Sequence, residues 1–281
     1  MSVLEYDLGM LSIDQFIDGR LTKGSSYFSR AEVQSAVELK PQTLTATITR
    51  LIKRHRLANP RRDFYLILRP EDLITGAPDP ARWINGLMQH LGFDYRISLL
   101  RAASFHGSSH QAAMVFQVLT PRQQRDIAIG RHRIQFIYQS PEAFSQTNLP
   151  QYVDQLKTDT GYAKIAGREL ALLDCTRYFH NAGGINGVAQ IVKDIGSKAN
   201  PRHLRKLAAF FDTATVRRLG YLLELSGHQR QAEALEPHAK KAKTALLLDP
   251  TVQPLMAMHS ELCEKSAKWK LYINETVEID F

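Results

Sequence analysis

The sequence predicts an α+β fold in which a small amino-terminal domain of three helices and a hairpin precedes a larger mixed domain. Apolar residues recur at helical spacing between residues 12 and 53. Two runs rich in Val, Ile and Phe lie between residues 112 and 139, and helical patterns return from residue 167 onward. The 281 residues leave room for about two domains, and a hydrophobic fraction of 44% is ample for their cores.

The turn-forming segment 75–80 marks the expected domain boundary. Pro78 and Pro80 each disfavour helix at the preceding residue, and Gly76 adds a further turn former. We therefore expect an amino-terminal domain at residues 1–78 and a larger domain at residues 79–281.

The first two helices are predicted from their starts. Ser12 with Gln15, and Ser29 with Glu32, fit the capping box, in which each side chain bonds the backbone N–H of the other residue. Phe28 precedes the second box at the position of a hydrophobic staple, where it would contact Val33.

The third helix begins at Pro41, at a position where the missing N–H costs nothing. Leu44, Ile48 and Leu51 fall at i, i+4 and i+7 and must face inward. The opposite side then carries short polar groups and long cations: Gln42, Thr43, Ala46, Thr49, Arg50 and Lys53. Such a face suits a helix in the major groove of DNA, where amides and Arg read base edges and Lys and Arg hold phosphates.

A hairpin is predicted next, with strands at residues 57–59 and 64–68 and the segment Pro60–Asp63 at its tip. The order of three helices and a hairpin predicts a winged helix-turn-helix, with Arg61 and Arg62 on the wing. No acidic residue occurs between Lys40 and Arg62.

The charge pattern favours an anionic partner. The formal net charge is +8, and cationic charge attracts phosphate polymers and acidic surfaces. A run of cations at a helix C-terminus is also typical of a solvated face, because the helix dipole favours it there. The residues expected to contact double-stranded DNA are Arg30, Lys40, Gln42, Thr43, Thr45, Ala46, Thr49, Arg50, Lys53, Arg54, Arg56, Arg61 and Arg62.

The larger domain is predicted to begin as a small sheet covered by helices and to end helix-rich. We expect helices at residues 81–91 and 96–106 and strands at 112–119 and 133–139, with residues 121–131 as a connection. The helices expected after residue 167 span 168–179, 184–195, 201–211, 213–226 and 229–243. A last strand is expected within residues 269–279.

A second basic surface is a further possibility. Its residues would be Arg202, Arg205, Lys206, Arg217 and Arg218. Cations in the first turn of the helix capped by Asn200 oppose the macrodipole, which hints at a partner such as DNA, RNA or an acidic protein. A solvated surface, or an inward Arg217 or Arg218 paired with Glu224, stays an alternative.

The sequence offers no catalytic residue, cofactor or metal site. His106 to Ser109 resembles the Gly-Ser loop of nucleotidyltransferases, but the next acidic residue is the lone Asp126, whereas Mg²⁺ needs paired carboxylates. His106, His110 and His132 lack metal-binding spacing. A nucleic-acid-processing enzyme is therefore a minor alternative.

The carboxyl end, the cysteines and the hydropathy add weaker signals. Asn274, Glu278 and Asp280 could form a site, although such groups more often cap an edge strand. The two cysteines suggest neither a disulfide framework nor zinc, and no span of about 20 apolar residues occurs. We expect a cytoplasmic protein without a membrane partner.

Several segments resemble, in order and spacing, the AbiEi family of antitoxins from type IV toxin–antitoxin systems, which act in abortive infection and phage defence. They are ISLLRAASFHG (97–107), RELALLD (168–174), VRRLGYLLE (216–224) and WKLYINETVEID (269–280). The resemblance implies a winged helix-turn-helix that represses its own operon by binding inverted repeats. It also implies a second domain that counters a nucleotidyltransferase toxin without requiring a stable complex.

The hypothesis is thus a DNA-binding repressor and antitoxin that is not an enzyme. A stand-alone winged-helix transcription regulator, whose second domain serves dimerisation or ligand sensing, stays the alternative. One departure from the family is the wing tip, where Pro60–Asp63 stands in place of the glycine of many relatives.

Overall fold

A computed structural model describes residues 11–108, 115–252 and 264–279. The chain forms two compact units. Unit 1 comprises Met1–Asp94, Arg125–Gln135 and Leu156–Ala163, and unit 2 comprises Tyr95–Gln124, Phe136–Gln155 and Lys164–Phe281. The expected boundary between residues 78 and 79 falls inside the first segment of unit 1. The described residues combine helices with three sheets, so the predicted α+β class is confirmed.

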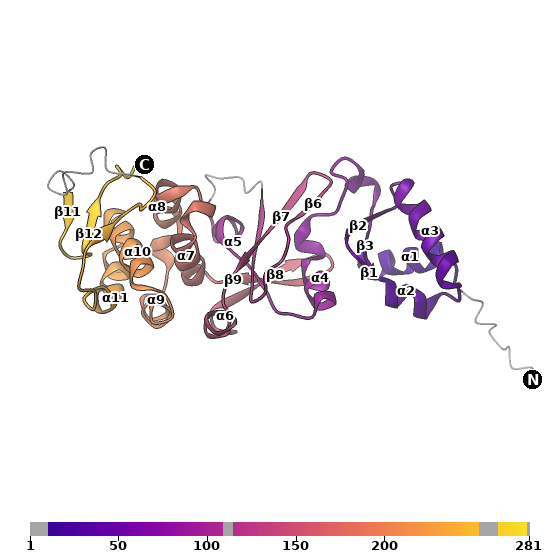
Figure 1. Cartoon of the computed structure of the whole chain (residues 1–281), viewed down its shortest axis with the longest axis horizontal. Helices are drawn as coiled ribbons and strands as arrows, with labels where there is room; N and C mark the ends of the chain where they lie inside the picture. The colour runs from indigo at the N-terminus through magenta and orange to yellow at the C-terminus, as the bar shows by residue number, and fades with distance from the viewer. Residues whose placement is uncertain (1–10, 109–114, 253–263, 280–281) are drawn as a thin grey trace, which may run out of the picture. The chain divides into compact units, whose positions relative to one another are not determined.

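Unit 1 begins with three helices beside a three-stranded antiparallel sheet of order β1-β3-β2 (Figure 1). Both predicted capping boxes are present, at Ser12 with Gln15 and at Ser29 with Glu32. The elements are α1 (Ile13–Thr22), β1 (Tyr27–Ser29), α2 (Arg30–Ala36), α3 (Pro41–Lys53), β2 (Leu57–Arg61) and β3 (Phe64–Ile67). Strand β1 was not predicted, because three residues between two helix signals are too few to show alternation.

The core of these elements is the stripe predicted for the third helix. Leu44, Ile48 and Leu51 are buried, and they belong to a cluster that includes Phe28 and Val33. Phe28 and Val33 are fully buried, as expected for a hydrophobic staple. Burial of this stripe fixes the rotation of α3 about its axis and therefore decides which residues face solvent.

A six-stranded sheet follows, with the order β6-β7-β5-β4-β9-β8. Most neighbours with a described register are antiparallel, whereas β4 pairs with β9 in parallel through Ile97 and Ile165. Its strands are β4 (Arg96–Ile97), β5 (Phe116–Thr120), β6 (Ile127–Ile129), β7 (His132–Tyr138), β8 (Val153–Thr158) and β9 (Gly161–Ala166). The associated helices are α4 (Ile84–Leu91), α5 (Leu99–Phe105) and α6 (Pro141–Thr147).

The helix predicted at residues 96–106 needs correction. Arg96 and Ile97 are strand, Ser98 is extended, and the helix begins only at Leu99, whose φ of 52° turns the chain sharply. Periodicity could not separate these states because a short apolar run fits a buried strand as well as a helix. Strands β6, β8 and β9 and helix α6 were also absent from the sequence prediction.

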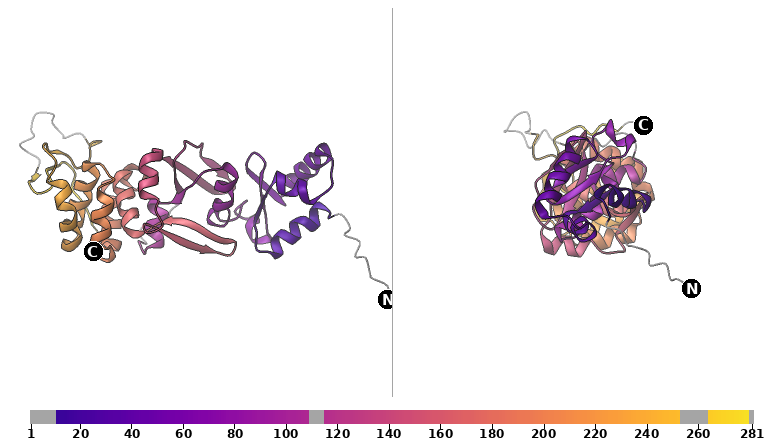
Figure 2. Two further views of the ribbon diagram at one scale, coloured as in Figure 1. Left: turned by 90° about the horizontal axis from the view of Figure 1, so that it is seen from below. Right: turned by 90° about the vertical axis from the view of Figure 1, so that its right-hand side faces the viewer.

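The rest of unit 2 is helix-rich, as predicted. Helices α7 (Arg168–Arg177), α8 (Gly184–Ile195), α9 (Pro201–Ala208), α10 (Thr213–Leu225) and α11 (Gln229–Ala239) pack together (Figure 2). A sheet of β10 (Leu246–Leu247), β12 (Leu271–Ile273) and β11 (Glu264–Ser266) follows, so the predicted last strand is shorter than expected. None of the helices in the described ranges has the length and apolar character that crossing a membrane requires.

Trp269 is fully buried against the middle of α10. A Cβ atom at Gly220 would overlap its indole ring, so this position requires glycine. The indole nitrogen donates to the Glu224 carboxylate at 3.1 Å. Two of the segments singled out in the sequence, 216–224 and 269–280, therefore meet in one packed cluster.

A buried ion pair joins several elements of unit 2. The Arg96 guanidinium binds both oxygens of Asp174 at 3.0 Å, and both side chains are completely buried. Ser98 donates to the same carboxylate at 2.7 Å, while Gln139 accepts from Arg96 at 2.8 Å. The Phe144 ring lies 5.2 Å from the guanidinium carbon. These bonds compensate the desolvation of two charges.

Removing one member of this pair should destabilise the fold strongly. We expect Asp174→Ala to lower the free energy of unfolding by about 3–5 kcal/mol, because Arg96 would stay buried without a counter-charge. Urea unfolding followed by circular dichroism measures the loss. The control is Lys240→Ala, which removes an exposed partner of Glu236 and should cost less than about 1 kcal/mol. Equal losses in the two variants would contradict this role of Asp174.

Candidate nucleic-acid interface

Helix α3 presents the face that its sequence predicts. Its N-terminus has no side-chain cap, and Pro41 occupies the first turn. With Leu44, Ile48 and Leu51 turned inward, the exposed residues are Gln42, Thr43, Thr45, Ala46, Thr49, Arg50 and Lys53. The predicted exposure of this face is confirmed, whereas contact with DNA stays a prediction.

Arg30 lies across the beginning of this helix. As the first residue of α2, its guanidinium donates to the Thr45 hydroxyl at 2.7 Å and to the Pro41 carbonyl at 3.2 Å. Its backbone N–H donates to the Asp63 carbonyl at 2.8 Å. Arg30 therefore contacts both the start of α3 and the β2–β3 turn, and one of its guanidinium nitrogens uses both of its protons inside the protein.

Among the residues that the structure describes, most cations at and near α3 have no acidic partner. Lys40, Arg50, Lys53 and Arg54 are exposed, and none forms an ion pair with a carboxylate of the described residues. Arg56 differs, because it lies 3.6 Å from Asp18. Uncompensated cations beside an exposed helix produce the local positive potential that attracts phosphate.

The β2–β3 turn separates the two wing arginines. The side chain of Arg62 is 97% exposed and 3.5 Å from the neighbouring Asp63 carboxylate. Arg61 is half-buried and donates to the Arg125 carbonyl, and burial lowers the pKa of its guanidinium. Arg62 is therefore the wing cation more available to a ligand.

The side chain of Asn59 holds the β2–β3 turn together, a role that was not predicted from the sequence. Its side-chain amide donates to the Arg61 carbonyl and, at 2.7 Å, to the Phe64 carbonyl. Asp63 takes the left-handed conformation with a φ of 59° in this turn. The tip thus needs no glycine, because aspartate is among the residues that tolerate this conformation.

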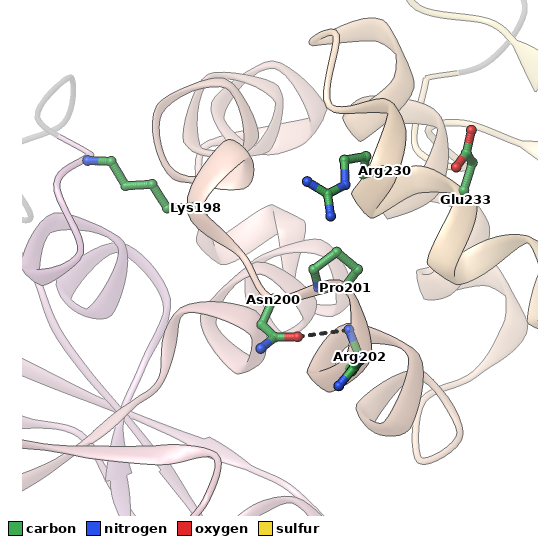
Figure 3. A pocket seen from close by; sticks show the side chains of 6 residues that line it. All are labelled: Lys198, Asn200, Pro201, Arg202, Arg230 and Glu233. Atoms are coloured by element: carbon green, nitrogen blue, oxygen red, sulfur yellow. Dashed lines mark hydrogen bonds between the residues drawn. The ribbon is translucent and has the colours of Figure 1, made fainter.

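Three cations, Lys198, Arg202 and Arg230, line an open pocket of unit 2 with a volume of about 630 Å³, together with the acidic Glu233. Figure 3 shows the Arg230 guanidinium near Pro201, whereas the Lys198 ammonium extends away from it. Asn200 caps α9 by accepting from the backbone of Arg202 and His203. We define the second basic cluster as the exposed residues Lys198, Arg202, Arg205, Lys206 and Arg230. Lys198 and Arg230 were not predicted from the sequence, because Lys198 precedes α9 and Arg230 belongs to α11.

Arg217 and Arg218 do not belong to that exposed cluster, which corrects the sequence expectation. Arg217 is 3% exposed and donates to the Thr244 carbonyl at 2.7 Å. Arg218 donates to the Leu248 carbonyl at 2.7 Å, and burial lowers the pKa of both guanidinium groups. Their function here is to satisfy carbonyls of irregular chain.

The suggested pairing of these arginines with Glu224 is also wrong. The Glu224 carboxylate accepts from the Trp269 indole and lies 2.6 Å from the Lys268 ammonium.

The histidines considered for metal binding are engaged with the backbone. His106 and His132 lie at hydrogen-bonding distance from the Ala166 and Ala77 carbonyls, and burial lowers the pKa of His106. His110 lies outside the described residues. Within those residues, no group of three or more His, Cys, Asp or Glu side chains could hold a metal ion.

The other suggested sites have structural partners. Ser108 donates to Asp194 at 2.6 Å. Cys175, one of the two cysteines of the sequence, was not proposed as a site, and burial raises the pKa of its thiol, which disfavours a reactive thiolate. The Asn274 amide donates to the carbonyls of Asp249 and Val252. The backbone of Glu278 donates to Asn186, and Asp280 lies outside the described residues.

A family model described as the AbiEi antitoxin C-terminal domain matches residues 96–225. The chain carries an AbiEi antitoxin domain. The predicted resemblance to the AbiEi family is thereby confirmed, and the match begins at Arg96, the residue at the centre of the buried ion-pair network. The family is one of antitoxins, so the chain is related to regulatory proteins that act against a toxin.

The solved structure of the RV2827C protein from Mycobacterium tuberculosis has a similar fold. The similarity covers 92% of this chain and 89% of the other, with a TM-score of 0.62 and 13% sequence identity. No curated protein matches the chain.

Proposed function

We propose that residues 1–78 form a winged helix-turn-helix that binds double-stranded DNA. The observation that carries this proposal is the exposed face of α3, which is flanked by cations without acidic partners among the described residues. The element order α1, β1, α2, α3, β2 and β3 suits such a module, with α3 as the recognition helix and the β2–β3 turn as the wing.

The proposed contacts divide by chemistry. Gln42, Thr43 and Arg50 offer groups that can read base edges, and Lys53 offers a cation for a phosphate. The phosphate-contacting set would also include Lys40, Arg54, Arg56 and Arg62. Arg30 and Arg61 are better suited to shaping this surface, because their guanidinium groups already bind protein oxygen atoms.

We further propose that this antitoxin represses its own operon by binding inverted repeats and counteracts a nucleotidyltransferase toxin. The AbiEi antitoxin domain supports a toxin partner in general. The packed core of Arg96 and Asp174 lies inside the matched residues, whereas α3 lies outside them. The two activities are therefore proposed to rest on different residues of the chain.

A gel-shift titration on DNA upstream of the gene tests the role of α3. We expect Arg50→Ala combined with Lys53→Ala to weaken binding about 10- to 100-fold, since a base contact contributes roughly 1–3 kcal/mol and a phosphate contact adds to it. The matched control is Lys23→Ala, an exposed cation that follows α1. Unchanged affinity in the folded double variant would overturn the assignment of α3.

We propose that the second basic cluster binds DNA phosphates. Its removal should then change how DNA affinity depends on salt concentration, and not which DNA sequence is preferred. Arg202→Ala combined with Arg205→Ala should reduce the slope of log K against log salt by about 0.9 for each phosphate that is no longer neutralised. Affinity for unrelated duplexes should fall to the same extent. Lys240→Ala removes another exposed cation, which lies outside the cluster and pairs with Glu236, and should leave the slope unchanged. A double variant with the wild-type slope would mean that the cluster is only a solvated surface.

Antitoxic activity can be separated from DNA binding in the full-length chain. The Arg50→Ala and Lys53→Ala double variant should still relieve growth arrest by the nucleotidyltransferase toxin proposed above, because α3 lies outside the antitoxin domain. Growth is measured with toxin and antitoxin expressed from promoters that the protein does not control. A variant that binds no DNA and also fails to relieve arrest, although stable and present at normal levels, would contradict this division.

A further inference from the structure

The centre of the exposed face of α3 is less polar than its sequence suggests. Thr45 and Thr49 both carry hydroxyl groups, but each hydroxyl donates its proton to a carbonyl of its own helix. The Thr45 hydroxyl donates to the Pro41 carbonyl at 2.8 Å, and that of Thr49 donates to the Thr45 carbonyl at 2.9 Å. A threonine hydroxyl has one proton, so neither group has a donor left for a ligand.

Arg30 restricts Thr45 further. Its guanidinium donates to the Thr45 hydroxyl oxygen at 2.7 Å while that oxygen donates to Pro41. The hydroxyl is thus held from two sides against the helix backbone and α2. Since Thr45 as a whole is exposed, it offers an external partner its methyl group and, from the hydroxyl oxygen, at most one remaining lone pair.

The exposed apolar groups form a continuous strip. Thr45 and Thr49 are four residues apart, and Ala46 and Thr49 are three apart, so all three are neighbours on the helix surface. We define Thr45, Ala46 and Thr49 as the methyl strip. Gln42 lies one turn before it, and Lys53 lies one turn after it.

We propose that the methyl strip reads the C5-methyl groups of thymines in the major groove. The proposal rests on the DNA binding proposed above and names the bases recognised. Thymine is the base that presents a methyl group there, and apolar side chains are its usual partners. Thr45 and Thr49 are separated by about 6 Å along the helix, which approaches two base steps of about 3.4 Å each.

Gln42 fits the same sequence class. A side-chain amide can pair with both N6 and N7 of adenine, the partner base of thymine. The strip and the amide together favour a half-site in which neighbouring A·T pairs face the first two turns of α3. Arg30 acts as a positioning residue in this arrangement, because it holds the Thr45 hydroxyl away from the exposed side.

Uracil substitution tests the proposal directly, since uracil differs from thymine only by the C5-methyl group. The probe is the upstream duplex carrying uracil in place of thymine at single positions of the protected site, bound by the full-length protein. Wild type should bind about fourfold less tightly for each methyl read, as burial of one such group contributes roughly 0.8 kcal/mol. Substitution outside the protected site should have no effect.

Two threonine variants provide the matched comparison. Thr45→Ser combined with Thr49→Ser keeps the hydroxyls and removes two of the three methyl groups of the strip. The preference of this variant for thymine over uracil should therefore fall to what Ala46 alone provides. Thr45→Val combined with Thr49→Val keeps methyl groups and should preserve the preference for thymine. Serine variants that retain the full preference, or valine variants that lose it, would overturn the proposal.

The wild-type result distinguishes failure of the methyl strip from failure of DNA binding. A wild-type protein that binds thymine and uracil duplexes with equal affinity still binds DNA, and that result removes only the methyl strip. A wild-type protein that shifts no upstream DNA removes both proposals.

Discussion

The buried pair of Arg96 and Asp174 is the interaction on which unit 2 depends most. Two charges have been taken out of water, and the fold compensates them through a bidentate ion pair, hydrogen bonds from Ser98 and to Gln139, and the ring of Phe144. Arg96 belongs to strand β4, Phe144 to helix α6 and Asp174 to helix α7. Such a network is stable only when all of these elements are in place. The fold of the AbiEi antitoxin domain therefore depends on their correct arrangement around this ion pair.

In unit 1 the corresponding constraint is apolar. Leu44, Ile48 and Leu51 bury one side of α3, and the helical repeat then leaves the opposite side exposed. The polar character of that side is modified by hydrogen bonds within the helix, which consume the hydroxyl protons of two threonines. The surface offered to a ligand is therefore set by both the residue types and their local bonds.

The arginines of this chain serve two different purposes, which composition cannot distinguish. Arg50 and Arg62 project into solvent, where a guanidinium can bind phosphate. Arg61, Arg217 and Arg218 donate to backbone carbonyls, and burial lowers the pKa of each. A net charge of +8 therefore overstates the charge available on the surface for an anionic partner.

Features that depend on neighbouring residues could be predicted from the sequence, whereas those that join distant segments could not. Capping boxes at Ser12 and Ser29, the inward stripe of α3 and the five helices after residue 167 follow from local hydrogen bonding and the helical repeat, so short stretches of sequence contain them. Only the tertiary structure shows that Arg96 lies in a strand and pairs with Asp174. It also shows that the Arg217 side chain is buried and donates to a carbonyl more than twenty residues away in the sequence. Folding also added β1, β8 and β9 to their sheets and gathered Lys198 and Arg230 beside α9. Such contacts form because every buried polar group needs a hydrogen-bond partner somewhere in the fold. The partner can lie far away in the sequence, so the spacing of neighbouring residues does not predict it.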